Sequence, residues 1–325
     1  MFVDASAPGK VILAGEHFVV HGGKALALAI DRYVDVRVSS SKHPLEVYHS
    51  ERGEVDYLDQ RGRWILSSEF RNLTPIETSV KKTFEYLGKR ANLKLDISSN
   101  IPVSAGLGSS ASLSAAIVKG VSHRLGYELS RDELIKVASE SEKVVHGDPS
   151  GVDLATVISG GLVLFDGSTR RILKNVKDVD FPLVVGNSLD RRSTGDLVGN
   201  VGVLSSKYKD IFSLFVHLSD HVVEQGLEAT LRGDLETLGR MFNISHGLLH
   251  SIGVSTAKLE AMIFKSLSHG ALGAKVTGAG GGGCMIVLTG SEENRDMVGA
   301  LKSLGSEPFI VRPDNYGVKS ILKAK

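Results

Sequence analysis

A segment rich in glycine and serine, Pro102–Ser112, could bind a phosphate group. Small residues let a backbone come close to a ligand, and the apolar stretch over 113–125 predicts that a helix follows. That helix would begin near Ser109 or Ser110 and direct its free amides at the loop, an arrangement that binds anions. A serine hydroxyl there could also bind Mg²⁺. The alternative is a plain turn in which a serine caps the helix.

A second glycine-rich segment, Gly278–Gly283, holds five glycines in six positions. Its spacing matches the G-x-G-x-x-G pattern of dinucleotide-binding folds, but that pattern requires a helix next, whereas Cys284–Leu288 predicts a strand. A hairpin needs fewer glycines, so we expect this backbone to pass close to a substrate or a phosphate. Cys284 is interpreted as a small core residue and not as a nucleophile.

Two carboxylates could serve phosphoryl transfer. Glu142 lies late on a predicted helix, and Asp153 follows a turn that the glycines and proline of 147–151 impose. Phosphoryl transfer needs one carboxylate for a metal ion and often a second one to accept or orient the hydroxyl proton. The alternative is that both are solvated surface acids.

A lysine and two histidines near the N-terminus form a fourth candidate site. Lys10 leads into a predicted strand, so it could neutralise a phosphate or lower the pKa of a neighbouring acid. A solvated lysine is the alternative. His17 and His21 have the i, i+4 spacing of metal ligands. We do not expect a metal there, because no third ligand is evident and Glu16 precedes the first histidine instead of following it.

Composition and missing motifs exclude several classes of protein. The 325 residues carry a net charge of +1, so no basic field favours nucleic acid as a partner. The single cysteine excludes a disulfide framework within the chain and a multi-cysteine zinc site. No apolar run reaches the length of a membrane span and the N-terminus lacks signal-peptide features, so we expect a cytoplasmic protein. Neither the P-loop sequence G-x-x-x-x-G-K-[ST] nor the protein-kinase catalytic signature occurs.

Hydrophobic periodicity predicts an α+β chain in two lobes. Strands are expected over 11–14, 34–38, 93–97, 162–165, 182–185, 274–277, 285–288, 309–312 and 318–322. Capping boxes at Thr74–Glu77 and Ser130–Glu133 predict helices that end near residues 88 and 147. The composition becomes mainly helical over 193–269, which favours two domains, 1–180 and 181–325.

Together and in this order, these segments resemble the three motifs of the GHMP kinases, a superfamily of small-molecule kinases. Pro8–Gly22 resembles the first motif, Pro102–Ser112 the second and Lys275–Cys284 the third, so the resemblance runs from residue 8 to 288. Within the superfamily, Pro8–Gly22, His146–Asp153 and the run over 192–194 are similar to the mevalonate kinases. One departure is Asp148, which stands where that family commonly has asparagine or threonine, away from the apparent catalytic positions.

The resemblance implies a fold and a reaction. The fold would combine an N-terminal lobe like the second domain of ribosomal protein S5 with a ferredoxin-like C-terminal lobe. The reaction would move the γ-phosphate of ATP, with Mg²⁺, onto the primary alcohol of mevalonate, giving 5-phosphomevalonate for isoprenoid biosynthesis. The partners would be ATP and this small molecule, with no nucleic acid and no membrane, and a homodimer is left open.

The same resemblance assigns roles to residues. Asp153 would accept or orient the alcohol proton, and Lys10 would pair with it and with the γ-phosphate. Ser110 and Glu142 would hold Mg²⁺. The ATP phosphates would be wrapped by residues of the second motif: Pro102, Ala105, Gly106, Leu107, Gly108, Ser109, Ser110 and Ala111. The substrate pocket would include Glu16, His17, Arg192, Thr194, Gly278, Ala279 and Gly280.

Three alternatives remain. Another GHMP kinase, such as a phosphomevalonate or homoserine kinase, is the nearest; a phosphorylated substrate would need additional cations, and the region of His17 and Arg192 offers few. A non-catalytic ligand sensor on this fold would be expected to lack the acid or the lysine, and both Asp153 and Lys10 are present. A metalloprotein built on the two histidines is the most distant.

Overall fold

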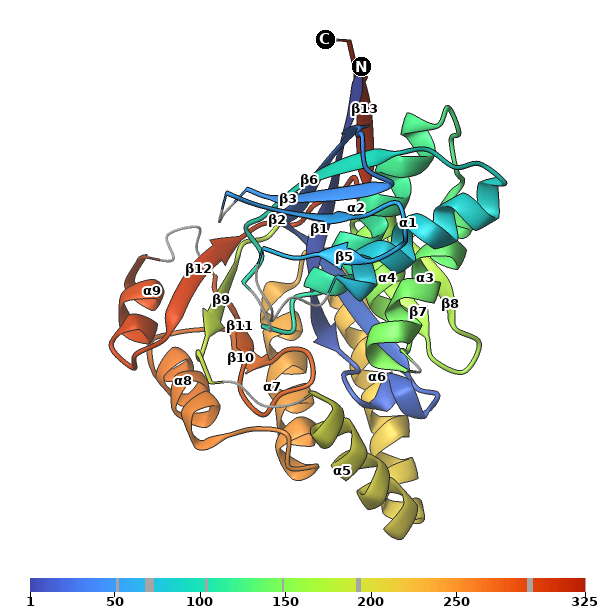
Figure 1. Cartoon of the computed structure of the whole chain (residues 1–325). Coiled ribbons are helices and arrows are strands. Elements are labelled where there is room, and N and C mark those ends of the chain that lie inside the picture. Colours follow the sequence, from blue (N-terminus) through green and yellow to red (C-terminus); the bar gives the residue numbers. More distant parts are fainter. Residues whose placement is uncertain are drawn as a thin grey trace.

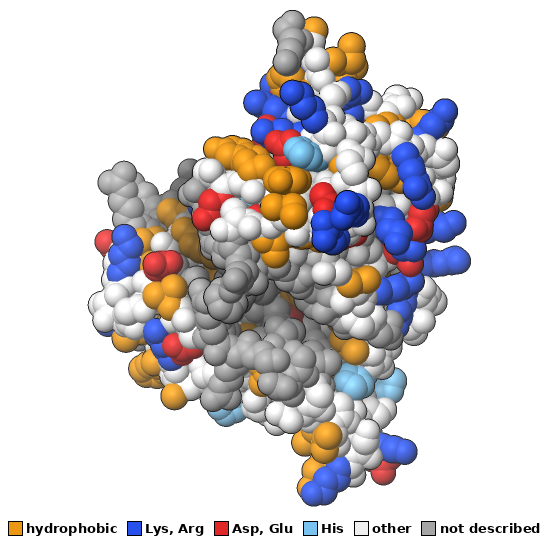
Figure 2. Space-filling view, viewed as in Figure 1, with side chains coloured by type: hydrophobic (Ala, Val, Ile, Leu, Met, Phe, Trp, Pro, Cys, Tyr) orange, Lys and Arg blue, Asp and Glu red, His pale blue; other side chains and the backbone are white. Residues whose placement is uncertain are grey.

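The computed structural model describes residues 1–50, 53–67, 73–102, 105–147, 149–190, 194–290 and 295–324. Two sheets form its framework, the larger in the upper part of Figure 1 and the smaller at the lower left. Figure 2 shows acidic and basic side chains both distributed over the described surface of this face. No helix in the described ranges is long and apolar enough to cross a membrane.

Within the described ranges, the larger sheet has nine strands, in the order β13-β1-β2-β6-β3-β4-β5, with β7 paired to β2 and β8 paired to β7. Their bounds are β1 (Phe2–Ala14), β2 (Lys24–Ser40), β3 (Leu45–His49), β4 (Glu54–Leu58), β5 (Trp64–Ile65), β6 (Leu93–Ser99), β7 (Leu162–Asp166), β8 (Arg171–Val176) and β13 (Lys319–Lys323). All pairs are antiparallel except β3 with β6.

The central strands β1 and β2 are much longer than the sequence predicted. Residues 2–10 are rich in alanine, serine, proline and glycine, which have low strand propensity, yet pairing with both β2 and β13 keeps them extended. The first part of β2 shows no alternation, because residues 25–30 are all buried. This strand contacts α2, α4 and α6, so neither of its faces meets solvent there.

Four helices belong to the first half of the chain: α1 (Thr74–Leu87), α2 (Ser109–Arg124), α3 (Arg131–His146) and α4 (Val152–Ser159). Helix α2 contacts β1 and β2, while α1 and α3 contact α2. The predicted capping box at Ser130 and Glu133 is confirmed. The one predicted at Thr74 is wrong, because the N-cap is Leu73 and the Glu77 carboxylate accepts a hydrogen bond from the Trp64 indole at 2.7 Å.

The smaller sheet has the antiparallel order β10-β11-β9-β12, with β9 (Leu183–Asn187), β10 (Gly273–Val276), β11 (Cys284–Leu288) and β12 (Glu307–Val311). The helices of the second half of the chain are α5 (Thr194–Lys207), α6 (Lys209–Arg232), α7 (Leu235–Ser251), α8 (Ala257–Ser268) and α9 (Arg295–Lys302). The sequence of elements, one strand, helices, two strands, a helix and a strand, together with this order gives a ferredoxin-like sheet. The mainly helical stretch predicted over 193–269 is confirmed wherever the structure describes it.

The two sheets share one hydrophobic core. The largest buried cluster includes residues of β1 and β2 together with Val222 of α6, Phe242 of α7 and Ile286 of β11. The last strand, β13, returns to the larger sheet beside β1. The division into 1–180 and 181–325 stays a prediction, and any division must assign β13 to the N-terminal sheet.

Candidate active site

The glycine–serine segment forms the entry into α2, as predicted. The helix begins at Ser109 with Gly108 as its N-cap in a left-handed conformation, φ 79°. A glycine has no side chain to cap the first amides, so the alternative of a serine-capped plain turn does not apply. The Lys10 amide donates to the carbonyl of Leu107 at 2.9 Å, which fixes this loop against β1. The start of α2 therefore offers an anion-binding helix end.

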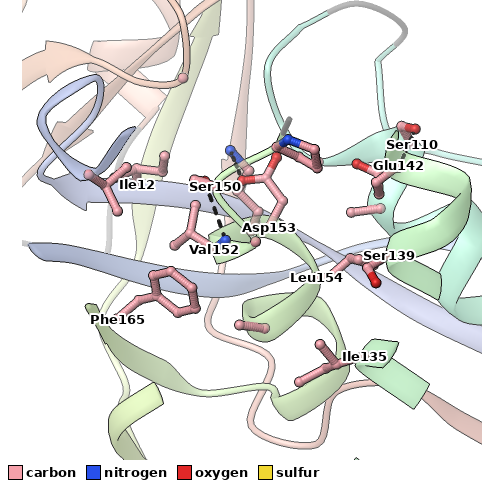
Figure 3. A pocket seen from close by; sticks show the side chains of 18 of the residues that line it. Ile12, Ser110, Ile135, Ser139, Glu142, Ser150, Val152, Asp153, Leu154 and Phe165 are labelled. Atoms are coloured by element: carbon pink, nitrogen blue, oxygen red, sulfur yellow. Dashed lines mark hydrogen bonds and ion pairs between the residues drawn. The ribbon is translucent and has the colours of Figure 1, made fainter. Parts of the chain in front are cut away.

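Lys10 and Asp153 form an ion pair beside this helix end. Lys10 Nζ lies 3.0 Å from Asp153 Oδ1, with the lysine 3% exposed and the aspartate 37% exposed. Asp153 stands in the first turn of α4, whose N-cap is Gly151 with φ 90°. The helix dipole favours a carboxylate at that place. Lys10 is thus not a solvated lysine, and Figure 3 shows Asp153 projecting from the start of α4.

Ser110 and Glu142 meet where α2 and α3 lie side by side. The Ser110 hydroxyl donates to Glu142 Oε1 at 2.6 Å, and Glu142 is only 4% exposed. Figure 3 shows the two side chains facing each other. The alternative of a solvated surface acid is therefore wrong for Glu142. A hydroxyl and a carboxylate oxygen are hard donors of the kind that Mg²⁺ prefers.

Glu16 and His17 follow β1 and reach toward the smaller sheet. Glu16 is buried and forms an ion pair with Lys275 of β10. Burial raises the pKa of Glu16, and the Lys275 ammonium opposes that rise. His17 Nε2 donates to the carbonyl of Ala279 at 2.9 Å, so this nitrogen carries the hydrogen. Burial lowers the pKa of His17, which favours the neutral ring.

A cavity of about 1670 Å³ joins these groups. Its walls include Lys10, Asp153, Ser110, Glu142, Glu16, His17, Gly278, Ala279 and the loop residues Ala105, Gly106, Leu107, Gly108, Ser109 and Ala111. Segments far apart in sequence therefore bring a helix end, the carboxylates of Glu16, Glu142 and Asp153, a buried cation and a histidine to one space. That combination suits transfer of a phosphoryl group to an acceptor held at the other end.

Some predicted residues lie elsewhere. Pro102 and Gly280 are described but do not line the cavity. Thr194 begins α5, but its side chain lies outside the described part of the structure, as does the whole of Arg192. These assignments stay predictions.

Most of the second glycine-rich segment, Gly278–Gly283, packs against other parts of the protein and does not line the cavity. A Cβ at Gly280 would lie 2.2 Å from the carbonyl oxygen of Val254, and one at Gly281 would lie 2.2 Å from Leu197. Of this segment only Gly278 and Ala279 line the cavity. The expectation of close backbone approach to a ligand therefore applies at most to the start of the segment, and tight chain packing explains the other glycines. Cys284 is buried, and burial raises the pKa of its thiol to about 12, as expected for a core residue.

The residue that sequence reasoning missed is Lys275. It is completely buried, although it lies in a strand between Ala274 and Val276. A lysine inside an apolar strand was the available signal. Among the described residues, no group of three or more His, Cys, Asp or Glu side chains is placed to hold a metal ion. His21 instead packs its ring on Phe212, with centroids 4.7 Å apart.

Comparison with known proteins agrees with this geometry. The family models for the N-terminal and C-terminal domains of GHMP kinases match residues 76–161 and 227–306, so the fold is that of a GHMP kinase. A mevalonate kinase of Pyrococcus furiosus is 34% identical, covering 98% of both chains. The crystal structure of L. major mevalonate kinase in complex with R-mevalonate has a TM-score of 0.80 at 27% identity and covers 96% of each chain. The Methanococcus jannaschii enzyme has a TM-score of 0.78 at 26% identity, covering 96% of this chain and 98% of its own. The chain belongs to the mevalonate kinase family.

Proposed function

We propose that the chain transfers the γ-phosphate of ATP to the primary alcohol of mevalonate and forms 5-phosphomevalonate, a step of isoprenoid biosynthesis. The observation that carries this proposal is the Lys10–Asp153 pair, which lies in one cavity with the uncapped start of α2. The substrate comes from the family: the L. major relative was crystallised with R-mevalonate, and the P. furiosus relative is a mevalonate kinase.

The proposed mechanism follows from charge and position. The α2 amides and Lys10 would hold the ATP phosphates and offset the negative charge that spreads over the transferring group. Asp153 would accept the hydroxyl proton while the alcohol oxygen forms its bond to the γ-phosphorus. The bond from that phosphorus to the β,γ-bridging oxygen breaks, and ADP leaves. Both groups need fixed positions, which the strand β1 and the helix α4 provide.

Ser110 and Glu142 are the residues that would hold Mg²⁺ in this proposal. Their oxygens lie 2.6 Å apart at the start of α2, so the pair fits a cation shared with the nucleotide phosphates. When bound, the ion would neutralise phosphate charge. Replacing Glu142 by Gln should raise the Mg²⁺ concentration needed for half-maximal rate, as measured by metal titration. An unchanged requirement would remove Glu142 from this role.

The other end of the cavity would receive the acceptor. Mevalonate carries a carboxylate, a tertiary hydroxyl with a methyl group, and the primary alcohol. Val19 and Phe165 line the cavity and belong to one apolar cluster, which suits contact with the methyl and methylene groups. Glu16 and His17, which precede Val19 by three and two residues, supply polar groups to the same cavity.

Assembly and location complete the proposal. Ile211, Leu214 and Leu218 expose an apolar stripe at i, i+3 and i+7 on α6, which offers a surface for a second copy of the chain. Light scattering at micromolar protein would decide between a homodimer and a monomer.

We place the protein in the cytoplasm, and cell fractionation would test that.

The experiment that tests the function is an ADP-release assay with Mg·ATP. Mevalonate, phosphomevalonate, homoserine and galactose should be compared side by side. We expect turnover with mevalonate and at most traces with the other three. Turnover with another member of the panel would support the kinase activity but contradict mevalonate as the substrate. ATP binding without any turnover would favour the non-catalytic ligand sensor.

A further inference from the structure

The segment over 15–23 joins β1 to β2 and is referred to below as the β1–β2 turn. It contains a short 3₁₀ helix, η1 (Phe18–His21), of which Val19 and Val20 line the cavity. Val20 is 49% exposed, so much of this apolar side chain stays open at the cavity wall. The proposed function places the acceptor at this end of the cavity, so the position of the turn bears on acceptor binding.

The two ends of the β1–β2 turn are held in different ways. At its start, His17 donates to the carbonyl of Ala279. At its end the ladder between β1 and β2 gives no support, because the last pair of that ladder is Ala14 with Leu26. Lys24, the first residue of β2, therefore lies beyond the ladder with β1 and needs another partner there for its backbone amide.

Helix α6 packs directly against this turn. Phe212 is buried, and its ring centroid lies 5.9 Å from that of Phe18 and 4.7 Å from that of His21. One helical turn further along α6, Cγ1 of Val216 would lie 3.1 Å from a Cβ at Gly23. In Figure 1 the turn, in blue, lies beside α6. One face of α6 therefore supports the turn.

Asp220 continues this face of α6 by one more helical turn and supplies a polar contact. Its Oδ1 accepts a hydrogen bond from the backbone amide of Lys24 at 2.6 Å, between residues 196 positions apart in the sequence. A hydrogen bond to a carboxylate is stronger than one between neutral groups. A Cβ at Gly23 would lie 3.0 Å from the same oxygen, so the backbone is in close contact with this carboxylate. Asp220 thus ties the end of the turn to α6.

We propose that Asp220 is a positioning residue for the acceptor, because its bond to the Lys24 amide holds Val19 and Val20 in place at the cavity wall. Asp220 itself is described and does not line the cavity, so it acts through the backbone of the turn and not by touching a ligand. This inference rests on the proposed function, which assigns the acceptor to this end of the cavity.

Loss of the bond would leave the turn in its binding position for only part of the time. The apparent affinity for a ligand falls in proportion to the fraction of molecules whose site is competent. A hydrogen bond to a charged group changes such an equilibrium by roughly tenfold to a hundredfold. The reaction itself would be spared, because the start of α2 and the pair of Lys10 with Asp153 lie outside the turn.

A contact that only stabilises the fold would give another kinetic pattern. Its loss would reduce the share of protein that is folded and active. The measured kcat would then fall in proportion, while the KM values for both substrates would stay the same. The two explanations therefore differ in which kinetic constant changes.

The test uses three variants of the complete chain. Asp220→Ala removes the acceptor of the hydrogen bond, whereas Asp220→Asn keeps an oxygen that can accept from the same amide. Glu224→Ala is the matched control, because Glu224 lies one helical turn further along α6 and pairs with the side chain of Lys24 instead of its backbone. Alanine favours helix, so α6 should persist in both alanine variants.

We expect Asp220→Ala to raise the KM for mevalonate roughly tenfold or more, with kcat and the KM for ATP close to the wild-type values. Asp220→Asn should restore most of the affinity for mevalonate. Glu224→Ala should have the KM values of the wild type. Steady-state kinetics in the ADP-release assay would measure these constants, and calorimetric titration with mevalonate should rank the variants in the same order.

The midpoint of urea unfolding shows how far each variant changes stability. A lower midpoint for Asp220→Ala with an unchanged KM for mevalonate would show that the contact is only structural and would overturn the inference. An equal rise in the KM for ATP, or an equal effect of Glu224→Ala, would overturn it too. Wild-type protein that does not phosphorylate mevalonate would overturn the proposed function, and the inference with it.

Discussion

Two lysine–carboxylate pairs meet the cavity with different exposures. Asp153 is 37% exposed next to a buried Lys10, whereas Glu16 is 1% exposed next to a buried Lys275. An accessible carboxylate can reach an entering hydroxyl and pass its proton on, while a sealed one can only hold a fixed charge. This difference supports Asp153 as the base.

Replacing Asp153 by Asn removes the proton acceptor and keeps the size of the side chain. Turnover with mevalonate should fall on the order of a hundredfold or more, as the loss of a general base usually causes. ATP binding should change little, because the phosphate-binding end of α2 stays intact. Steady-state kinetics and nucleotide titration would measure both, and near-normal turnover would exclude Asp153 from this role.

At the residue scale, sequence patterns predicted the residues to which the mechanism gives roles, and these residues line the cavity. Lys10, Asp153, Ser110 and Glu142 lie in motifs whose spacing and resemblance could be read directly, and the structure brings them together. The pairing of Lys275 with Glu16 could not be found this way, because the two residues lie 259 positions apart and only folding places their side chains together.

At the scale of elements, the start of α2 depends on Gly108, which adopts a left-handed conformation and leaves room for the Lys10 side chain. Gly108 has φ 79°, and a Cβ there would lie 2.9 Å from Cγ of Lys10. Gly126, just beyond the other end of the same helix, has φ 84° with nothing within 4 Å of an added Cβ. The two positions share the backbone penalty and differ only in the contact with Lys10.

Replacement of either glycine by Ala should lower stability by about 1 kcal/mol, the usual cost of a left-handed conformation for a residue with a Cβ. Only Gly108→Ala should also reduce kcat, because the methyl group displaces Lys10 from Asp153. Urea unfolding and the ADP-release assay would separate the two effects. Equal kcat values for the two variants would contradict the role given to the loop.

The capping box of α3 predicts that the stability of the protein depends on pH. Hydrogen bonds from Ser130 and from the Tyr86 hydroxyl lower the pKa of Glu133 from 4.5 to about 2. A carboxylate with a lowered pKa in the folded state stabilises the protein fully above its unfolded value and loses that effect as the pH falls through its folded value. The stabilisation by Glu133 should therefore fade between about pH 4.5 and pH 2.

Glu133→Gln should consequently lower the urea midpoint at neutral pH and lower it less near pH 3. Asp132→Asn is the matched control, since Asp132 lies in the same first turn but takes no part in the capping box. If Glu133→Gln lowers the urea midpoint by the same amount at both pH values, the charge of Glu133 does not contribute to the stability of the protein.

At the scale of the whole molecule, the sequence predicted the order of most strands and helices but not how they combine. The six strands predicted after residue 160 agree with the structure within a few residues, whereas β8 was not predicted. The full length of β1 and the return of β13 to its side were not readable, because both depend on pairing between the two ends of the chain. The shared core explains why the site forms: it packs β1, α2 and α4 with β11 of the smaller sheet, and Gly278 and Ala279, which follow β10, line the same cavity.

The position of the transferred phosphate tests the central claim most directly. Purified protein should be incubated with Mg·ATP and mevalonate, and the product examined by phosphorus NMR. The account predicts a new phosphomonoester signal split by the two protons of the adjacent methylene carbon, as in 5-phosphomevalonate, formed together with ADP. No new phosphoester, or an ester on the tertiary oxygen with no such splitting, would contradict it.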